Sequence, residues 1–366
     1  MKVAHLMGTL NRGGAETLLL DICRNAEAAE FDMILIHRRE GIMLNDFQDS
    51  GVELVKITPK SFWDVGYLFR LRRIIRERQF GLLHAHQNID ALVALIVTIG
   101  LGTKVVLNIH GLGLESGFIP STIRRVAISN VDLTLYVSKN QQAHYADRKR
   151  SLVLYNGLDF TKTGAASISE IRNEFKVADD EMLLGSVGNF TNVRDQITVC
   201  HFLAVIASEG IRFKFIFIGA PSPAEPKLYA ACVDFCRKQG IEDRVIFTGS
   251  RSDVPTLLPQ LDAFIYSTVH DTFGIALVEA IASGIPVFVN DQAVMREVTN
   301  DGAWANIYQT KNINDLYSKF IQFYEEPEMY LEKARENATA IKVRYDIGNY
   351  LRNLKQIYAS LLADRY

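Results

Sequence analysis

Short apolar runs alternate with helical patterns along most of the chain, and this alternation narrows the possible folds more than any other feature. The first two runs lie at 2–7 and 33–37, with a helical pattern at 15–26 between them. A strand, a crossover helix and a second parallel strand form the unit from which open α/β sheets are built. We therefore predict a mostly parallel, doubly wound sheet with helices on both faces.

The alternation breaks once and then restarts. Segment 156–169 (NGLDFTKTGAASIS) is rich in Gly, Ser, Thr and Ala and lacks a period, which indicates a linker. The further strands that we expect lie at 53–57, 82–86, 105–110, 133–138, 183–187, 214–219, 245–248, 263–267 and 287–290. The 366 residues also exceed the about 250–300 residues that one core usually supports. We predict two doubly wound, Rossmann-like domains, 1–160 and 161–345, with a helix at 346–366.

The tail of the sequence, 316–366, shows helical periodicity and no strand pattern. A break near 345–348 divides it into two expected helices. Ligands of open α/β sheets bind beyond the carboxyl ends of the strands, so we expect the two domains to face each other across a central cleft. The chemistry is then expected in loops that follow strands.

Composition excludes several classes of protein. With 48% hydrophobic and 22% charged residues the chain is an ordinary globular protein, and its net charge of −2 gives no basic excess for nucleic acid. Four cysteines are too few for a disulfide framework, and Cys232 and Cys236 indicate buried thiols rather than metal ligands. The start shows no secretory pattern, and the longest apolar run, 91–101, is far shorter than the ~20 residues of a membrane helix. We expect a cytoplasmic protein.

One segment, 67–80 (YLFRLRRIIRERQF), holds five arginines and one glutamate, with apolar residues at helical spacing. A solvated helix face above an apolar core is one interpretation. The other is contact with anionic lipid headgroups or with a lipid-linked diphosphate.

Two loops of the first half follow strands and carry candidate residues. In GTLNRGGAE at 8–16, paired glycines precede a helix start, where backbone N–H groups attract phosphate. This loop matches neither the dinucleotide fingerprint nor a Walker loop, so a tight turn is an equal alternative. His110 ends another expected strand, and His84 and His86 end a neighbouring one; a purely structural role is the alternative for each.

Two loops of the second half place charged residues beside helix starts. Arg194, in GSVGNFTNVRD, lies beside a helix N-terminus, where a positive charge is unfavourable. This position is explained if the arginine and the helix N-terminus together hold a diphosphate, and a solvated arginine is the alternative. Glu279 lies within an apolar helix face, where vicinal ribose hydroxyls would satisfy its carboxylate. Asp271 is either an N-cap or a ligand of sugar hydroxyls. The N–H groups expected to face phosphate are those of Thr272, Phe273 and Gly274.

At these residues the sequence resembles the retaining glycosyltransferases of family 4, which have the GT-B fold and include bacterial O-antigen and capsule sugar transferases. That family carries an acidic residue, seven further residues, and then an E-A-x-A-x-G-x-P run. Asp271 takes the first acidic place here, and Glu279 begins EAIASGIP. Further matches, in the order of the family, are GGAE at 13–16, NIHG at 108–111, NGLD at 156–159 and RVIFTG at 244–249.

The resemblance implies how a nucleotide diphosphate sugar binds. Glu279 holds the nucleotide ribose, whereas Asp271 and the backbone of 272–274 hold the donor sugar and the diphosphate. Arg194 takes the place of a diphosphate-binding lysine of the family. These roles come from the resemblance and not from the spacing of the residues.

Three more residues receive roles in the same way. Gly14 is placed near the phosphates and His110 near the transferred sugar, so that His110 and Asp271 are the candidate catalytic residues. Arg251 is a weaker candidate for the base pocket. The last helix is expected to pack on the first domain.

The chain departs from the family at two positions. Asn189 stands where the family usually has an arginine, which removes one phosphate-binding charge. Asp271 is one methylene shorter than the usual Glu, which could alter the choice of sugar. No Asp-x-Asp pair occurs in the sequence, so we expect neither a metal bridge to the diphosphate nor a cofactor.

The implied reaction transfers a sugar, with UDP-sugars favoured, to a hydroxyl with retention of configuration. Together with the basic segment 67–80, the resemblance favours a lipid-linked or oligosaccharide acceptor and a peripheral position on the inner face of the membrane. A nucleotide-sugar epimerase of the same fold and a non-catalytic nucleotide-sugar-binding protein are the alternatives. Turnover that depends on an acceptor separates the transferase from both.

Overall fold

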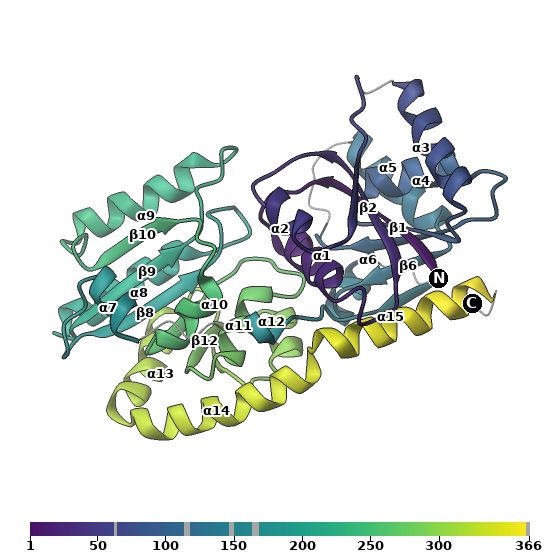
Figure 1. Ribbon diagram of the computed structural model, residues 1–366. Helices are drawn as coiled ribbons and strands as arrows, with labels where there is room; N and C mark the ends of the chain where they lie inside the picture. The colour runs from purple at the N-terminus through teal and green to yellow at the C-terminus, as the bar shows by residue number, and fades with distance from the viewer. Residues whose placement is uncertain (62–63, 113–117, 146–149, 163–167, 364–366) are drawn as a thin grey trace. The chain divides into compact units, whose positions relative to one another are not determined.

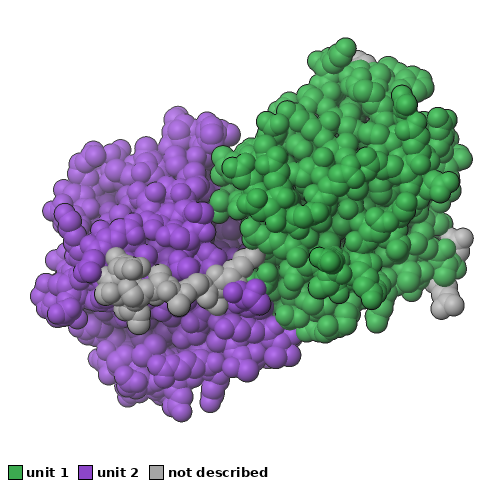
Figure 2. Space-filling view, in the orientation of Figure 1, with its two compact units in different colours: residues 1–159, 345–366 green, residues 160–344 purple. Residues whose placement is uncertain are grey.

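The computed structural model describes residues 1–61, 64–112, 118–145, 150–162 and 168–363 (Figure 1). The chain forms two compact units, residues 1–159 with 345–366, and residues 160–344 (Figure 2). Each unit is an open parallel sheet with connecting helices, so the predicted α/β fold class is confirmed.

The sheet of the first unit has seven parallel strands in the order β3-β2-β1-β4-β5-β6-β7. The strands are β1 (Lys2–Thr9), β2 (Asp32–Arg39), β3 (Glu53–Lys56), β4 (Leu82–Ala85), β5 (Lys104–Ile109), β6 (Leu133–Tyr136) and β7 (Ser151–Val153). The order reverses at β1, which pairs with β2 and β4, and His5 of β1 lies opposite His84 of β4. The segments that follow β1 and β4 therefore lie at a topological switch point.

The last helix of the sequence belongs to the first unit. The helices of this unit are α1 (Gly14–Arg24), α2 (Leu44–Gln48), α3 (Val65–Arg78), α4 (Asn88–Thr98), α5 (Phe118–Asn130), α6 (Lys139–Tyr145) and α15 (Ile347–Leu362). One face of α15, yellow in Figure 1, is buried in the same core as β1 and α1 through Ile347, Leu351, Leu354, Tyr358 and Leu361. A Cβ added to Gly157 would lie 2.4 Å from the Cβ of Tyr350, so a glycine is needed where the chain passes α15. The expected packing of the last helix on the first unit is confirmed.

The sheet of the second unit has six parallel strands in the order β10-β9-β8-β11-β12-β13. The strands are β8 (Met182–Val187), β9 (Phe213–Ile218), β10 (Val245–Gly249), β11 (Ala263–Tyr266), β12 (Val287–Asn290) and β13 (Asn306–Tyr308). Its α-helices are α7 (Ile168–Glu174), α8 (Gln196–Ser208), α9 (Pro226–Lys238), α10 (Val254–Leu257), α11 (Ile275–Ala282), α12 (Ala293–Val298), α13 (Ile313–Glu325) and α14 (Pro327–Arg344). The strand order reverses at β8, so the loops after β8 and β11 lie at the switch point of this unit.

The structure differs from the expected pattern in the tail and at the sheet edges. The tail forms α13, α14 and α15 instead of two helices, because Pro327 begins a new helix. The strands β7 and β13 have three residues each, too few to show a pattern. Residues 163–167 of the predicted linker lie outside the described residues. Cys232 and Cys236 are buried, as expected.

Within the described ranges, no helix combines the length and the apolar character needed to cross a bilayer.

Candidate functional site

Arg194 and Asp271 form an ion pair at the switch point of the second unit. Nη1 of Arg194 donates a hydrogen bond to Oδ2 of Asp271 at 2.8 Å, and the hydroxyl of Tyr266 donates to the same oxygen at 2.7 Å. The guanidinium carbon lies 4.6 Å from the centroid of the Tyr266 ring, a cation–π contact. The side chains of Arg194 and Asp271 are only 20% and 12% exposed. The two residues were singled out separately in the sequence, and the structure brings them together.

The backbone fixes the position of this pair. Arg194 pairs with Thr268 in an antiparallel bridge, and Oγ1 of Thr268 donates to the carbonyl of Val193 at 2.6 Å. The loop after β8 is thus fastened to the loop after β11. A Cβ added to Gly188 would lie 3.2 Å from Nε of Arg194, so the glycine leaves room for the guanidinium.

The segment between Asp271 and α11 folds back on the Asp271 carboxylate. Oδ1 accepts hydrogen bonds from the N–H groups of Thr272 at 2.7 Å and Phe273 at 3.3 Å. These N–H groups, predicted to face a phosphate, therefore donate to the carboxylate in this structure, because an adjacent charged acceptor satisfies them. The N-cap of α11 is Gly274, not Asp271, with a left-handed φ of +84°. A Cβ there would also lie 3.2 Å from Cε of Met295, so the position favours glycine twice over.

Glu279 and Arg251, the other charged candidates of the second unit, occupy different surroundings. Glu279 is half-buried on α11, and its backbone carbonyl accepts a hydrogen bond from Oγ of Ser283 at 2.8 Å. Arg251 is held by two carboxylates, with Nε 2.8 Å from Oδ1 of Asp253 and Nη2 3.1 Å from Oε2 of Glu174. Both hydrogen bonds raise the pKa of Arg251 above its ordinary value. The structure thus joins Arg251 to a separate ion-pair cluster.

Asn189 stands where the family has an arginine, and its side chain is engaged with the backbone. Its Oδ1 accepts a hydrogen bond from the N–H of Ala220 at 2.9 Å. The amide therefore connects the segments that follow β8 and β9. This bond needs an acceptor, which an arginine could not supply.

His110 lies at the end of β5 within a cluster of histidines. Its Nε2 is hydrogen-bonded to Nδ1 of His86 at 2.9 Å, and Nε2 of His86 is hydrogen-bonded to Nδ1 of His5 at 2.9 Å. His84 is bonded through Nδ1 to the hydroxyl of Tyr358 on α15, and its ring stacks on that of His86 with centroids 4.6 Å apart. Burial lowers the pKa of His5 to about 3 and that of His110 to about 4. The sequence singled out His110, His86 and His84 but not His5.

Gly14, the remaining candidate of the first unit, is the first residue of α1. The N-cap of this helix is Gly13, which has an extended backbone and no side chain to cap the helix. A Cβ on Gly13 would lie 2.6 Å from Oε2 of Glu16. The helix start is thus built from glycines beside a partly buried Glu16, whose pKa is raised by burial.

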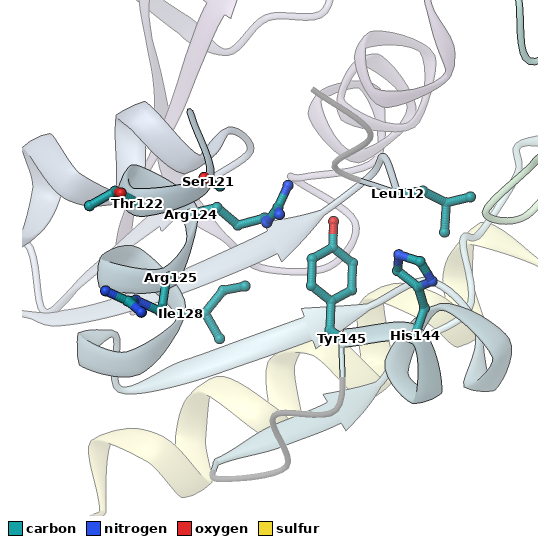
Figure 3. Close-up of a pocket in the computed structure, with 8 residues that line it drawn as sticks. All are labelled: Leu112, Ser121, Thr122, Arg124, Arg125, Ile128, His144 and Tyr145. Atoms are coloured by element: carbon teal, nitrogen blue, oxygen red, sulfur yellow. The ribbon is translucent and has the colours of Figure 1, made fainter. Parts of the chain in front are cut away.

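A cavity of about 410 Å³ opens in the first unit between α5 and α6, and sequence reasoning did not find it. Figure 3 shows Arg124 extended toward Tyr145, with His144 beside that tyrosine. The guanidinium carbon of Arg124 is 5.8 Å from the centroid of the Tyr145 ring. Tyr145 also donates to the carbonyl of Gly111 at 3.0 Å, which ties this cavity to the residue that follows His110.

The basic segment 67–80 forms most of α3, and most of its arginines are paired. Nη1 of Arg72 donates to the carbonyls of Val97 and Ile99 at 2.7 and 2.8 Å, at the end of α4. The ion pairs are Arg70 with Asp64, Arg73 with Glu77, and Arg78 with Glu53. Most of this charge thus supports the fold of the first unit.

An apolar groove of about 350 Å³ lies between α3 and α4. Its rim holds four large apolar side chains with high exposure: Val65 at 59%, Phe69 at 69%, Ile96 at 43% and Ile99 at 68%. Arg72 lines the same groove. Exposed apolar side chains gathered in this way mark an interaction surface more often than scattered ones do.

Solved structures with this architecture are known. HepE from Anabaena, in complex with UDP and glucose, aligns with a TM-score of 0.88 at 20% identity, over 98% of this chain and 100% of that one. WaaG, a glycosyltransferase involved in lipopolysaccharide biosynthesis, aligns with a TM-score of 0.74 at 15% identity, over 97% and 99%. The two units with their open parallel sheets therefore define the GT-B fold of glycosyltransferases.

Two family models and several known relatives match most of this chain. The model "Glycosyltransferase Family 4" matches residues 12–162, and "Glycosyl transferases group 1" matches residues 167–340. The putative glycosyltransferase EpsF of Bacillus subtilis (strain 168) is 23% identical over 314 residues, 79% of each chain. The O-antigen biosynthesis glycosyltransferase WclY of Escherichia coli is 22% identical over 311 residues, 81% of this chain and 82% of the relative. The chain belongs to glycosyltransferase family 4, as its motifs predict.

Proposed function

We propose that this glycosyltransferase is retaining and metal-independent. Its donor is a nucleotide diphosphate sugar, preferably a UDP-hexose or UDP-N-acetylhexosamine. Its acceptor is a hydroxyl of a lipid-diphosphate-linked saccharide in bacterial surface polysaccharide or O-antigen synthesis. The observation that carries the proposal is the pair of Arg194 and Asp271 at the switch point of the second unit. A guanidinium matches phosphate oxygens, and a carboxylate accepts from sugar hydroxyls.

The proposed reaction breaks the bond between the anomeric carbon and the diphosphate and forms one to the acceptor oxygen. The departing diphosphate gains negative charge, which a preorganised cation stabilises. Among the described residues, the Arg194 side chain hydrogen-bonds only to Asp271, so further N–H groups remain for phosphate oxygens. The acceptor attacks on the face from which the diphosphate leaves, and its proton passes to the departing oxygen. Glu279 is assigned to the ribose and His110 to the transferred sugar.

The named ligands of relatives support a UDP-sugar as donor. HepE has been solved with UDP-glucose as well as with UDP and glucose. A UDP-Gal:alpha-D-GlcNAc-diphosphoundecaprenol alpha-1,3-galactosyltransferase of Escherichia coli is 19% identical over 316 residues. Both names combine the uridine nucleotide with a hexose, which is the donor class proposed here.

The cavity between α5 and α6 supports an anionic acceptor. Arg124, Arg125 and His144 line it, and the eight described lining residues include no Asp or Glu (Figure 3). Such a lining suits a diphosphate better than a neutral sugar. An alpha-1,3-N-acetylgalactosaminyltransferase of Campylobacter jejuni, which acts on N,N'-diacetylbacillosaminyl-diphospho-undecaprenol, is 32% identical over 105 residues, 28% of this chain.

The groove between α3 and α4 supports a peripheral position on the inner face of the cytoplasmic membrane. Exposed apolar side chains on its rim and exposed arginines of α3 suit the boundary of an anionic bilayer. Replacing Arg73 and Arg76 by Gln should weaken binding to phosphatidylglycerol vesicles roughly tenfold, at up to about 1 kcal/mol for each charge. Lys238→Gln on α9 is the control. If the variant at Arg73 and Arg76 binds vesicles as tightly as the Lys238→Gln control, the membrane assignment is wrong.

The donor assignment is tested by thermal unfolding with UDP, GDP, ADP and their sugar conjugates. A ligand at 100 times its Kd adds about 2.7 kcal/mol to stability, so UDP should raise the Tm by several degrees. Glu279→Ala should abolish that shift, whereas Glu332→Ala, an exposed acid on α14, should keep it. Transfer is then measured with a lipid-linked acceptor. Folded protein that responds to none of these nucleotides would contradict the proposal, and turnover without an acceptor would favour the epimerase.

A further inference from the structure

Asn290, the last residue of β12, has no part in the proposed reaction, yet its side chain is hydrogen-bonded in the interior of the second unit. Its Oδ1 accepts a hydrogen bond from the N–H of Thr268 at 3.0 Å, and its Nδ2 donates to the carbonyl of Thr268 at 2.7 Å. Nδ2 also donates to Oγ1 of Thr310 at 3.0 Å. The exposed fractions of Asn290 and Thr268 are both 0%. A single buried amide thus holds both backbone groups of one residue in the loop that leads to Asp271.

The partners of this amide fix its orientation. A backbone N–H only donates and a backbone carbonyl only accepts, so Oδ1 must face the N–H of Thr268 and Nδ2 must face its carbonyl. The hydroxyl of Thr310 donates to Oδ1 of Asp291 at 2.6 Å, so its oxygen accepts the second N–H of Nδ2. Turning the amide over would place donor against donor and acceptor against acceptor. The observed arrangement is therefore the one that satisfies every bond.

The Asn290 side chain continues the sheet where the pairing of β11 with β12 ends. The last residues in this register are Tyr266 and Val289. Beyond them, the amide of Asn290 bonds to the backbone of Thr268, outside β11. The side chain ends in the same chemical group as a peptide unit, so it supplies the donor and the acceptor that a further strand residue would supply. Neither an ionised aspartate nor a leucine, which are similar in size, offers both groups.

The other side of the same loop is paired with the segment that carries Arg194. Two backbone hydrogen bonds join segment 193–195 to segment 267–269. They run from the N–H of Val269 to the carbonyl of Val193 at 2.9 Å and from the N–H of Asp195 to the carbonyl of Ser267 at 3.1 Å. These bonds flank the bridge between Arg194 and Thr268. Segment 267–269 is therefore held by Asn290 on one side and by the loop after β8 on the other.

We propose that Asn290 is a positioning residue for the pair of Arg194 and Asp271. It fixes segment 267–269, which pairs with the backbone of Arg194 and leads directly into Asp271. The use of this placement rests on the proposed function, in which Arg194 meets the diphosphate and Asp271 the sugar. Groups that bind a reacting ligand lose much of their effect when they are displaced even slightly, so the support of the loop contributes to donor binding.

A purely local role is the competing interpretation, in which the amide only satisfies the buried backbone of Thr268. The two interpretations differ at the backbone amides of Val269 and His270. Both donate to the carbonyl of Val193, at 2.9 and 3.2 Å, rather than to Asn290. A local role concerns Thr268 alone, whereas a positioning role extends to these two amides.

Amide hydrogen exchange, measured by NMR on the full chain, distinguishes the two roles without any ligand. In Asn290→Ala we expect the amides of Val269 and His270 to exchange roughly tenfold faster relative to those of β11, which report global unfolding. Asn306→Ala is the matched control, because Nδ2 of Asn306 donates to the carbonyl of Val287 at 3.1 Å, at the opposite end of β12. The control should leave this ratio unchanged. Faster exchange at Thr268 alone, or equal effects of the two variants, would overturn the proposal.

Asn290→Asp keeps the size of the side chain and makes its function depend on pH. The ionised carboxylate has no donor for the carbonyl of Thr268, whereas the protonated acid offers one O–H and one carbonyl, as the amide does. Burial favours the protonated form, and so does the nearby carboxylate of Asp291, which accepts from Thr310. Lowering the pH from about 8 to about 5 should therefore bring the exchange rates back toward those of the wild type at the same pH. A defect of equal size at both pH values would contradict the role of the amide.

Nucleotide affinity measures the consequence for donor binding. Asn290→Ala should raise the Kd for UDP roughly tenfold and the Kd for UMP, which lacks the outer phosphate, by less than about threefold. An equal loss for both nucleotides would show that Asn290 does not act through the pair of Arg194 and Asp271. If the wild-type protein binds neither nucleotide, the proposed function fails, and the exchange rates still decide whether Asn290 positions this pair.

Discussion

Replacing Asp271 by Asn should tighten the binding of UDP and lower the stability of the protein. The carboxylate lies 2.8 Å from Nη1 of Arg194, and both side chains are largely buried, so it offsets the charge that a diphosphate would meet. A charge-assisted hydrogen bond of this kind contributes roughly 1–2 kcal/mol once its partial exposure is considered. The amide keeps the shape and an acceptor but removes the charge. We expect the free energy of unfolding to fall by about that amount and the Kd for UDP to fall roughly fivefold to tenfold.

Titration calorimetry with UDP, at low and at physiological ionic strength, measures this effect. The matched control is Asp262→Asn, which removes a carboxylate from Arg172 and from the N–H of Leu183 in the same unit. The control should lose stability and keep its Kd for UDP. The affinity for UDP-sugars should rise less than the affinity for UDP in Asp271→Asn, because the change also weakens the proposed contact of residue 271 with the sugar. A Kd for UDP that is unchanged or higher in Asp271→Asn would show that Arg194 does not meet the diphosphate.

Three further predictions concern stability. Leu354→Ala removes a fully buried side chain of α15 and should lower the free energy of unfolding by roughly 2–5 kcal/mol in a denaturant titration; a change below about 1 kcal/mol would contradict the packing of this helix. Gly274→Ala should lower the Tm by several degrees, because a left-handed φ costs an L-residue roughly 1–2 kcal/mol; an unchanged Tm would show that the loop relaxes. Burial lowers the pKa of His5 to about 3 and of His110 to about 4, so the unfolded chain binds more protons below about pH 6.5. Stability should therefore be full above that pH and fall toward pH 4 by roughly 1.4 kcal/mol per pH unit for each histidine; equal urea midpoints at pH 7.5 and 5 would refute this.

The fold could be predicted because parallel strands buried on both faces leave a strong signal. The strand β11 has the sequence AFIY, and all four residues are buried. Such runs, separated by helical patterns, determine the doubly wound topology with little ambiguity. The three-residue strands β7 and β13 escaped prediction because pairing at a sheet edge, not local sequence, makes them strands. Pro327 marks the boundary between α13 and α14 in the sequence, because proline is favoured at the first position of a helix.

The candidate site was predictable in part. Arg194 and Asp271 were accessible to sequence reasoning because each follows a strand and stands before a helix. Tyr266 could not be identified from the sequence, because a tyrosine that ends a buried strand resembles any core residue. His5 could not be identified from the sequence either, because its partner His86 is distant in the sequence and only the pairing of β1 with β4 brings the two residues together. The roles assigned to Gly14, Arg251 and Glu279 stay predictions until a nucleotide is bound.

The place of α15 in the first unit has a consequence for the order of synthesis. A ribosome completes β1 to β7 long before it makes the residues of α15, whose apolar face is part of their core. The second unit, whose segments are contiguous from residue 160 to 344, can emerge and fold in the meantime. During that interval the first unit exposes the surface that α15 later covers. Nascent chains of this protein should therefore depend on chaperones most strongly until the residues of α15 have left the ribosome.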